Sequence, residues 1–347
     1  MSTHEIEIVE IGKILPHPNA ERLVLTNLWG WQCCIGKGDF KEGDKAIYVP
    51  PDYMCPTDHS SFSFLAREGL TQQRIRVRRF RGSLSQGLLI QVPSELANLP
   101  VGSNVIDQLG IKRYMPPEDL NDMFVGGPSG LYVPKFDVES YQRYFDRFEE
   151  GEEVIVTEKI HGISSRFTYA QDKDGEGKQF CGTRVNWVGE PKDEKDKNNP
   201  YWKAFYQCPD IGEWCKANPG KILYGEAFGQ VKKFKYGGDK GRIFFAAFAI
   251  LEKNDWLDFD DCQKLISKFG YTIPWVPLVY RGPFDKEKIL AMAEGESSWP
   301  EADHIREGVV IIPIHERTDP EIGRVVLKMV SNRYLEKDDG LRKEFVQ

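Results

Sequence analysis

The sequence predicts an α+β protein of two domains, a small N-terminal β-barrel followed by a larger domain of antiparallel sheets with helices. The chain has 347 residues, of which 40% are hydrophobic and 29% charged, enough for two domains with a core each. Residues 1–110 alternate apolar and polar positions in short segments that Gly and Pro interrupt. Beyond residue 131 longer apolar strands alternate with segments of helical periodicity.

Charge and composition narrow the class of protein. The formal net charge of −7 argues against a protein that coats nucleic acid through a broad basic surface, although a local basic groove stays possible. No apolar run reaches the roughly 18 residues of a membrane helix, and the start MSTHEIEIVE is acidic without an apolar stretch. The seven cysteines form no Cys-x-x-Cys pair, which favours reduced thiols. We therefore expect a monomeric, intracellular, cytoplasmic protein with no membrane partner.

The segments in residues 1–110 have the character of short strands joined by tight turns. They include EIEIVEIGKI, RLVLTNLWGWQCCI and DKAIYVP, and then RIRVRRF and QGLLIQVP. This pattern is typical of a small antiparallel barrel. The piece PHPNAERL ahead of two strands resembles the opening of the oligonucleotide-binding (OB) barrels found in tRNA-binding modules. The resemblance implies an OB-like RNA-binding module over 1–110.

One basic run stands out in this region. In RIRVRRFRG, Arg74, Arg76 and Arg78 share one face of a strand, with Ile75 and Val77 on the other. An ordinary half-exposed strand would have the same alternation. Several arginines without an acidic partner exceed what solubility requires, so we predict that this face contacts the RNA backbone.

Residues 111–130 are the predicted linker, and residues 131–347 the second domain. The linker contains Pro116-Pro117 and Gly126-Gly127-Pro128 and shows no clear period. After it, Tyr141, Tyr144 and Phe148 lie near helical spacing, with Asp137 as the expected N-cap. A second helix is expected in DDCQKLISKFG. Strands are expected at 153–157, 163–170, 179–185, 221–228, 242–250, 307–313 and 324–330.

Four charged residues lie inside or at the ends of these apolar strands. Lys159 follows VIVTE, Glu226 lies in ILYGEAFG, Glu307 precedes GVVII, and Lys328 lies in RVVLKMV. Each alone could be a half-buried surface residue or a structural ion pair. An unpaired buried charge costs several kcal/mol. Two lysines and two glutamates in this position are therefore better explained by one shared polar site.

These stretches resemble, in order, the motifs of the covalent nucleotidyltransferases, which comprise ATP-dependent DNA and RNA ligases and mRNA capping enzymes. Motif I resembles KIHG, motif III YGEAFG, motif IIIa FFAAFAI, motif IV EGVVI and motif V VVLKMV. His161 at the third position of motif I, and the lead-in VPKFDVESYQRYF, are similar to the RNA ligase 2-like branch. An OB module ahead of this core resembles the RNA ligases that seal 3′-OH/5′-phosphate nicks. The resemblance implies ATP-grasp-like antiparallel sheets with helices.

The resemblance implies that Lys159 is a nucleophile. It would attack the α-phosphorus of ATP, expel pyrophosphate and hold AMP as lysyl-AMP. The AMP would move to the 5′-phosphate of RNA, and the 3′-OH would then attack that phosphate and release AMP. Because a protonated amine is a weak nucleophile, the site must favour the neutral form of Lys159.

The resemblance also implies roles for other residues. Phe248 would stack on adenine, Glu158 or its backbone would read the adenine edge, and Glu226 would bind the ribose hydroxyls. Glu307 would hold Mg²⁺ or Mn²⁺, and Arg184 and Lys328 would contact phosphate. The other nucleotide-binding positions of motif I are Ile160, Gly162 and Ser164.

Three positions depart from the family pattern. Ser164 replaces the more usual Arg or Asn, Ala249 replaces an aspartate of motif IIIa, and Val326 replaces the first of two motif V lysines. The role of His161 is open. Two alternatives to an RNA ligase acting on nicked duplex stay open: an mRNA-capping-type guanylyltransferase, and a non-catalytic RNA-binding protein with a degenerate ligase core.

Overall fold

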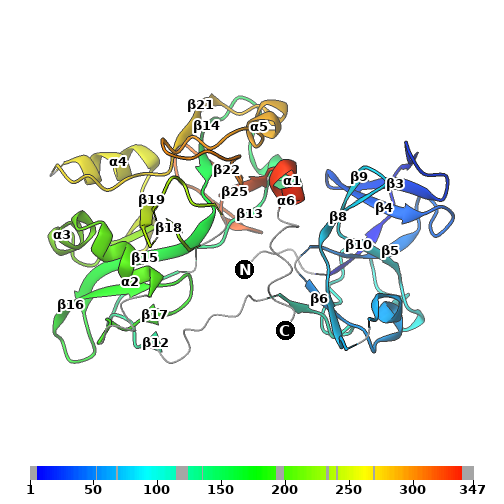
Figure 1. Cartoon of the computed structure of the whole chain (residues 1–347), viewed down its shortest axis with the longest axis horizontal. Coiled ribbons are helices and arrows are strands. Elements are labelled where there is room, and N and C mark those ends of the chain that lie inside the picture. Colours follow the sequence, from blue (N-terminus) through cyan, green and yellow to red (C-terminus); the bar gives the residue numbers. More distant parts are fainter. Residues whose placement is uncertain are drawn as a thin grey trace. The chain divides into compact units, whose positions relative to one another are not determined.

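The computed structural model describes residues 6–51, 53–67, 69–114, 124–134, 136–192, 199–231, 234–239, 241–268 and 270–337. The chain divides into two compact units, Ser2–Pro117 and Glu118–Gln347 (Figure 1). Both ends of the predicted linker 111–130 are strand, since Lys112–Arg113 pairs within the first unit and Phe124–Val125 within the second. The middle of that linker, 115–123, lies outside the described residues. The described helices are too short or too polar to cross a membrane.

The first unit consists of short antiparallel strands, drawn in blue and cyan in Figure 1. One three-stranded sheet has the order β1-β5-β10, a second β2-β3-β4, a third β11-β6-β7, and β8 pairs with β9. The strands are β1 (Glu7–Glu10), β2 (Ile14–Pro16), β3 (Leu23–Leu28), β4 (Trp31–Gly36), β5 (Lys45–Val49), β6 (Tyr53–Pro56), β7 (Gln72–Arg74), β8 (Val77–Phe80), β9 (Ser83–Gln86), β10 (Leu88–Gln91) and β11 (Lys112–Arg113). Two 3₁₀ helices are η1 (Ser60–Leu65) and η2 (Ser94–Leu96).

Strand β5 is central to this unit because both of its faces are buried. Ile47 and Val49 lie in one apolar cluster, while Ala46 and Tyr48 lie in another. This follows from the period of two in a strand, which sends neighbouring side chains to opposite faces. The Tyr48 hydroxyl donates to the carbonyl oxygen of Gln86 at 2.6 Å and so ties β5 to the end of β9.

A seven-stranded sheet forms one half of the second unit. Its order is β12-β17-β16-β15-β18-β19-β20, and all neighbours are antiparallel. The strands are β12 (Phe124–Val125), β15 (Gly162–Gln171), β16 (Gly177–Gly182), β17 (Trp187–Val188), β18 (Ile222–Gly229), β19 (Ile243–Glu252) and β20 (Asp255–Trp256). Helices α2 (Pro200–Gln207), α3 (Asp210–Ala217) and α4 (Phe259–Ser267) contribute residues such as Trp202, Trp214 and Cys262 to the core on one face. The opposite face is left for other contacts.

A five-stranded sheet forms the other half, in the order β13-β25-β22-β14-β21. Its strands are β13 (Glu139–Ser140), β14 (Glu153–Lys159), β21 (Leu278–Pro283), β22 (Gly308–Pro313) and β25 (Leu327–Val330). The core on one face includes residues of α1 (Tyr141–Tyr144) and α5 (Lys286–Met292), and Val154 and Val156 belong to it. Ile155 points the other way, into a cluster with Phe259 and Val326. The remaining elements are η4 (Phe145–Arg147), β23 (Thr318–Asp319), β24 (Gly323–Arg324) and α6 (Asn332–Lys337).

Most predicted strands of the second domain and its helix after residue 258 are present with small shifts of their ends. The predicted strand 324–330 is divided, because Arg324 belongs to β24, which pairs with β23, and Leu327–Val330 forms β25. The prediction of a helix capped by Asp137 was wrong. The helix starts at Tyr141, because Glu139–Ser140 pair in parallel with β25, at Leu327 and Lys328. This pairing holds the lead-in segment extended up to Ser140, which then occupies the N-cap position.

Candidate active site

A cavity of about 220 Å³ lies between the two sheets of the second unit. Most of the residues predicted from the motifs line it: Glu158, Lys159, Ile160, Ser164, Arg184, Glu226, Phe248 and Lys328. They come from β14 and β25 of the five-stranded sheet, from β15, β18 and β19 of the seven-stranded sheet, and from the turn before β17. The rest of the wall is mainly apolar, from Phe136, Val138, Phe259, Val276, Val310, Ile312 and Val326.

Lys159 ends β14 with its amine in an ion pair. The Nζ atom lies 2.6 Å from Oε1 of Glu307, and the two side chains are 26% and 11% exposed. The other carboxylate oxygen of Glu307 lies 3.3 Å from Nδ1 of His161, which is also 2.9 Å from the Tyr334 hydroxyl on α6. Glu307 therefore connects the lysine and the histidine of motif I.

The carboxylates control the charge of the amine. Burial alone would lower the pKa of Lys159, but Glu307 and Glu226 outweigh this and raise its pKa above the ordinary value. Burial would raise the pKa of Glu307, yet Lys159 and His161 hold it down to about 2. The nucleotide-free protein thus keeps Lys159 protonated against an ionised Glu307.

Two glycines permit the close contacts around this pair. A side chain at Gly308, which pairs with Lys159, would come within 2.1 Å of the carbonyl oxygen of Met329 on β25. A side chain at Gly162 would come within 2.4 Å of the carbonyl oxygen of Ala227 and 2.8 Å of Glu226 Cγ. The space beside Gly162 is therefore occupied by β18. The glycine brings the strand of Glu226 toward that of Lys159.

Strand register orders the cavity from a polar to an apolar end. Lys159 pairs with Gly308, Thr157 with Val310 and Ile155 with Ile312, so each step of two residues moves away from the amine. Lys328, on β25, pairs with Val310, on β22. On the opposite sheet Ser164 pairs with Glu226. Lys159, Glu226 and Glu307 therefore gather at one end, and the side chains further along are mainly apolar, with Arg324 among them.

Residues 152–330 match the family model RNA ligase, and residues 6–92 match a model of an OB-fold domain. The chain belongs to the RNA ligase family. This membership favours a ligase over a capping-type guanylyltransferase, and the first unit of the RNA ligase is an OB-fold region. A search of curated proteins found no match.

Solved structures of an RNA ligase from Naegleria gruberi resemble this RNA ligase over nearly all of its length. A lysine-to-alanine mutant with ATP and Mn has a TM-score of 0.80 and 29% identity, and the match covers 96% of this chain and 99% of that chain. The complex with PPi has a TM-score of 0.78 and 29% identity, with 96% and 98% covered. An apo mutant has a TM-score of 0.79 and 30% identity, again with 96% and 98% covered.

The carboxylate of Glu158, a residue that lines the cavity, is held by hydrogen bonds. It accepts a hydrogen bond from Ser297 Oγ at 2.6 Å and one from the Ser298 backbone N–H. Burial raises the pKa of Glu158, and these hydrogen bonds act in the opposite sense. The backbone N–H of Glu158 donates to the carbonyl oxygen of Pro277 at 2.8 Å, so both this N–H and the carboxylate are engaged within the protein.

Arg184 is presented by a turn that a buried arginine supports. Arg166 is 3% exposed and donates to the carbonyl oxygens of Arg184 at 3.4 Å and Val185 at 3.0 Å. The hydroxyl of Thr183 accepts from the N–H groups of Val185 and Asn186. The Arg184 side chain is itself 3.4 Å from the carboxylate of Asp137. Arg166 thus shapes the turn, a role that the sequence did not reveal.

The residues of the described chain include no cluster of three or more His, Cys, Asp or Glu side chains arranged to hold a metal ion. Mg²⁺ and Mn²⁺ at phosphoryl-transfer sites are usually held by one or two carboxylates together with substrate phosphates. Glu307 and Glu226, both hard oxygen donors close to Lys159, fit that requirement. The RNA ligase therefore carries carboxylates suited to a metal that arrives with a nucleotide.

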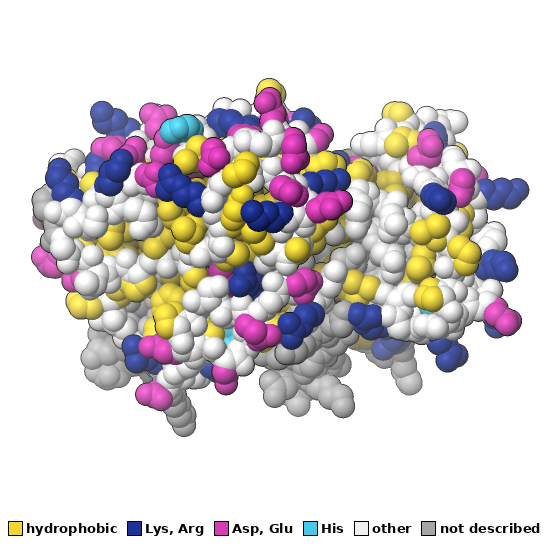
Figure 2. Space-filling view, turned by 90° about the horizontal axis from the view of Figure 1, so that it is seen from above, with side chains coloured by type: hydrophobic (Ala, Val, Ile, Leu, Met, Phe, Trp, Pro, Cys, Tyr) yellow, Lys and Arg dark blue, Asp and Glu magenta, His cyan; other side chains and the backbone are white. Residues whose placement is uncertain are grey.

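The predicted arginine face of the OB-fold region lies on two strands instead of one. Arg74 ends β7, and Arg78 belongs to β8, with Arg76 between them. Ile75 and Val77 are buried as the alternation predicts. The Arg74 guanidinium stacks on the Tyr114 ring at 3.7 Å, and Arg78 is exposed. Basic and acidic side chains are interspersed over the face drawn in Figure 2, as the net charge of −7 suggests.

Sequence reasoning missed three residues of the site. Tyr334 contacts His161 from α6, Arg324 lines the cavity two and four positions before Val326 and Lys328, and Phe136 lines it from the lead-in segment. The period of two in RVVLK would have placed Arg324 on the face of Lys328. Tyr334 and Phe136 depend on chain paths that no local pattern specifies.

Proposed function

We propose that this member of the RNA ligase family is an ATP-dependent ligase that seals 3′-OH/5′-phosphate nicks in RNA through lysyl-AMP and adenylylated RNA. The observation that carries the proposal is the position of the Lys159 amine, 2.6 Å from Glu307 at the polar end of a cavity that becomes apolar further along. Such a cavity suits a nucleotide, with phosphates at the cations and the base among apolar side chains. The similar Naegleria gruberi structures contain ATP or AMP with Mn.

Lys159 must lose its proton before it can attack. In the nucleotide-free protein the negative charges of Glu307 and Glu226 hold that proton. A divalent ion bound with the ATP phosphates would supply positive charge beside the amine, which lowers its pKa and offsets charge that develops on the phosphate. Glu307, with Glu226, would hold that ion, and its ion pair with Lys159 would then be weakened.

The first step then forms one bond and breaks another. Nζ of Lys159 attacks the α-phosphorus, the bond from that phosphorus to the bridging oxygen breaks, and pyrophosphate leaves. Lys328 and Arg184 stabilise the phosphate charge, and Phe248 stacks on the base. Val326 lacks the charge of a second motif V lysine, so Lys328 bears more of this role.

The second and third steps require RNA. The 5′-phosphate attacks the phosphorus of lysyl-AMP, which returns the amine and leaves AMP on the RNA end. The 3′-OH then attacks the activated 5′-phosphate, joins the strands and releases AMP. We assign Arg74, Arg76 and Arg78 to contacts with the RNA backbone during these steps. A protein distinguishes RNA from DNA by the 2′-OH and the A-form shape, so the nick should need ribose on its 3′-OH side.

Incubation with ATP labelled at the α-phosphate and Mg²⁺ or Mn²⁺, followed by a denaturing gel, tests the first step. Label should remain on the wild-type chain and be absent from Lys159→Ala. Retention of label by that variant would place the nucleophile elsewhere.

Sealing of a labelled nicked duplex tests the complete reaction. The wild type should join an RNA nick and fail on an all-DNA nick, and equal sealing of both would refute the RNA assignment. Lys328→Ala should reduce sealing by about a hundredfold, the scale of losing one transition-state contact. Normal sealing by Lys328→Ala would show that this lysine has no role at the phosphate.

A further inference from the structure

Phe136 lies between the two sheets at the cavity's apolar end. Its ring centroid is 4.5 Å from that of Phe248, on the seven-stranded sheet. It also packs against the apolar cluster of the five-stranded sheet, which includes Ile155, Ile312 and Val326. A single side chain from the lead-in segment therefore touches both walls of the cavity.

The cavity runs from a charged end to an apolar end, and Phe136 forms the wall at the apolar end. The charged groups at Lys159 and Glu226 occupy one end, and register places Ile312 and Val326 two strand steps away from the amine. Phe136 packs against the apolar cluster that contains these two residues. A nucleotide whose α-phosphate meets Lys159 would extend its base toward Phe136.

Phe136 is fixed in place by its neighbours. Arg324 lies with its guanidinium carbon 4.9 Å from the Phe136 ring centroid and 4.2 Å from that of Trp256. Trp256 itself meets Phe136 edge-on at 5.4 Å. Arg324 is 11% exposed and pairs with Glu316 through two hydrogen bonds. The wall is a packed aromatic and cationic group, which resists displacement by a ligand.

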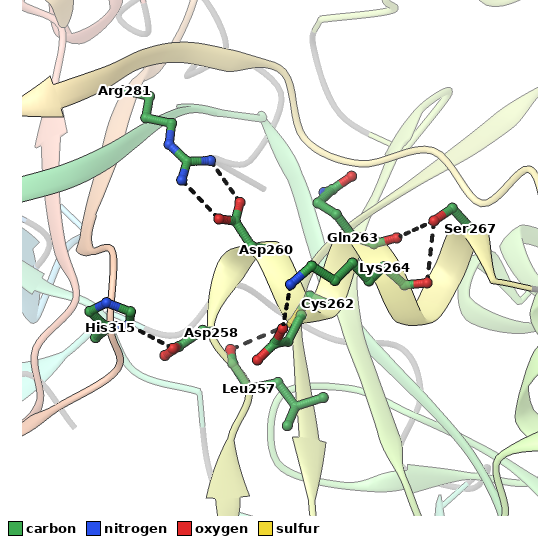
Figure 3. A network of polar contacts seen from close by, with 10 residues as sticks. Leu257, Asp258, Asp260, Cys262, Gln263, Lys264, Ser267, Arg281 and His315 are labelled. Carbon is green, nitrogen blue, oxygen red and sulfur yellow. Dashed lines mark hydrogen bonds and ion pairs between the residues drawn. The ribbon is translucent and has the colours of Figure 1, made fainter.

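The anchor continues to helix α4. The backbone N–H of Glu316 donates to the Asp258 carboxylate at 2.7 Å, and His315 lies 2.8 Å from the same carboxylate. Figure 3 shows His315 facing Asp258 at the start of α4, and Arg281 paired with Asp260 in the first turn. Phe259, which follows Asp258 in the sequence, lines the cavity. The segment that carries Glu316 is thus tied to the cavity wall on a second side.

We propose that Phe136 limits the size of the nucleotide base, so that this RNA ligase excludes purines with bulky groups on the six-membered ring. This inference rests on the proposed function. A purine whose N9 points back to the ribose at Glu226 presents its N1 and N6 edge to the end wall. Steric exclusion by a rigid, packed wall is the means by which pockets reject a substrate that is too large.

The test compares ATP with N6-benzyl-ATP in forming the covalent adduct, measured by the mass of the intact protein. The wild type should form the N6-benzyl-AMP adduct at least about tenfold more slowly than the AMP adduct. Phe136→Ala should bring the two rates within about threefold of each other, and Phe136→Leu should fall between, following the space each opens. Tyr132→Ala is the matched control, since Tyr132 lies in the same segment, is 62% exposed and does not line the cavity.

Each outcome distinguishes the wall from other causes. Exclusion of N6-benzyl-ATP by both Phe136 variants, while they still form the ATP adduct, would overturn the inference. Equal use of ATP and N6-benzyl-ATP by the wild type would also overturn it. So would a rate gain of the Phe136 variants with 8-benzylthio-ATP as large as their gain with N6-benzyl-ATP, because the substituent of 8-benzylthio-ATP points away from the N6 edge. Phe136→Leu keeps the test open where the alanine variant fails to fold. Absence of an ATP adduct in the wild type would reject the proposed function and this inference with it, a result different from exclusion of the benzyl analogue alone.

Discussion

The two units of this RNA ligase use positive charge in opposite ways. In the second unit Lys159 is largely buried, and its amine lies 2.6 Å from the carboxylate of Glu307. The negative charges of Glu307 and Glu226 raise the pKa of Lys159. In the OB-fold region Arg78 is exposed, and Arg74 stacks on an aromatic ring. A buried charge depends on its partner, so one substitution should change both reactivity and stability. Exposed charges act through a screened field, so their losses should add in small increments.

The ion pair in the cavity should give the largest effect. Lys159→Met or Glu307→Gln alone removes the closest partner of a partly buried charge, although His161 or Glu226 stays beside it. Each should lower the free energy of unfolding by about 3 kcal/mol. The double variant should lose much less than the sum, because both charges are gone. Thermal and urea unfolding of the four proteins would measure the coupling.

The surface pair of Lys216 with Glu213 provides the control for that cycle. Its atoms are 3.1 Å apart, but both side chains are more than half exposed. The same double-mutant cycle there should give a far smaller coupling, because solvent screens the pair. Equal coupling in the two pairs would contradict the contrast between buried and exposed charge.

The arginines of the OB-fold region should give the intermediate effect. Replacing Arg74, Arg76 and Arg78 by Ala should weaken binding of nicked RNA duplex and reduce the slope of log K against log salt by roughly one for each lost phosphate contact. Labelling of Lys159 by ATP should be unchanged. Binding titrations at several salt concentrations test this, with Lys41→Ala as a control for loss of one exposed cation. An unchanged slope in the triple variant would show that these three arginines do not contact RNA phosphates.

Lowering the pH should give the smallest effect, through protonation of Asp258 at the start of α4. Burial would raise the pKa of Asp258, but hydrogen bonds from His315 and the Glu316 N–H outweigh it and lower that pKa. A carboxyl whose folded pKa is depressed stabilises the fold above its ordinary value of 3.8, and this stability is lost as pH falls through the folded pKa. The melting temperature of the wild type should therefore fall more steeply below about pH 5 than that of Asp258→Asn. Asp261→Asn, on the exposed part of the same helix, should follow the wild type; identical curves for Asp258→Asn would refute the assignment.

The sequence predicted the polar end of the cavity better than its apolar end. Lys159, Glu226 and Lys328 were visible because a charge inside an apolar strand breaks a regular pattern. Their convergence on one cavity follows from the order of strands in two sheets, which the family motifs implied. The contact between Lys159 and Glu307 depends on the register of β14 against β22, and no local signal gives that register.

At the apolar end Phe248 was predicted, but Phe136 and Arg324 were missed for a physical reason. Phe136 lies in an irregular segment where one more aromatic residue carries no periodic signal, and its role depends on β13 pairing with a strand far along the chain. Arg324 shares a period of two with Lys328, a signal that the sequence contained. The arginine face at 74–78 was placed on one strand because alternation alone does not reveal where a chain passes from one sheet to another.

The parallel pairing of β13 with β25 has a consequence for the time at which the enzyme becomes active. Glu139 pairs with Leu327, so the five-stranded sheet cannot close until the chain has been synthesised beyond residue 330. Contacts of such high sequence separation form late, because a long loop must close before they form. A ribosome-bound chain would therefore display Lys159 well before Glu307, Lys328 and the strand beside Phe136 exist. The complete site therefore exists only when translation has passed its last strand, β25.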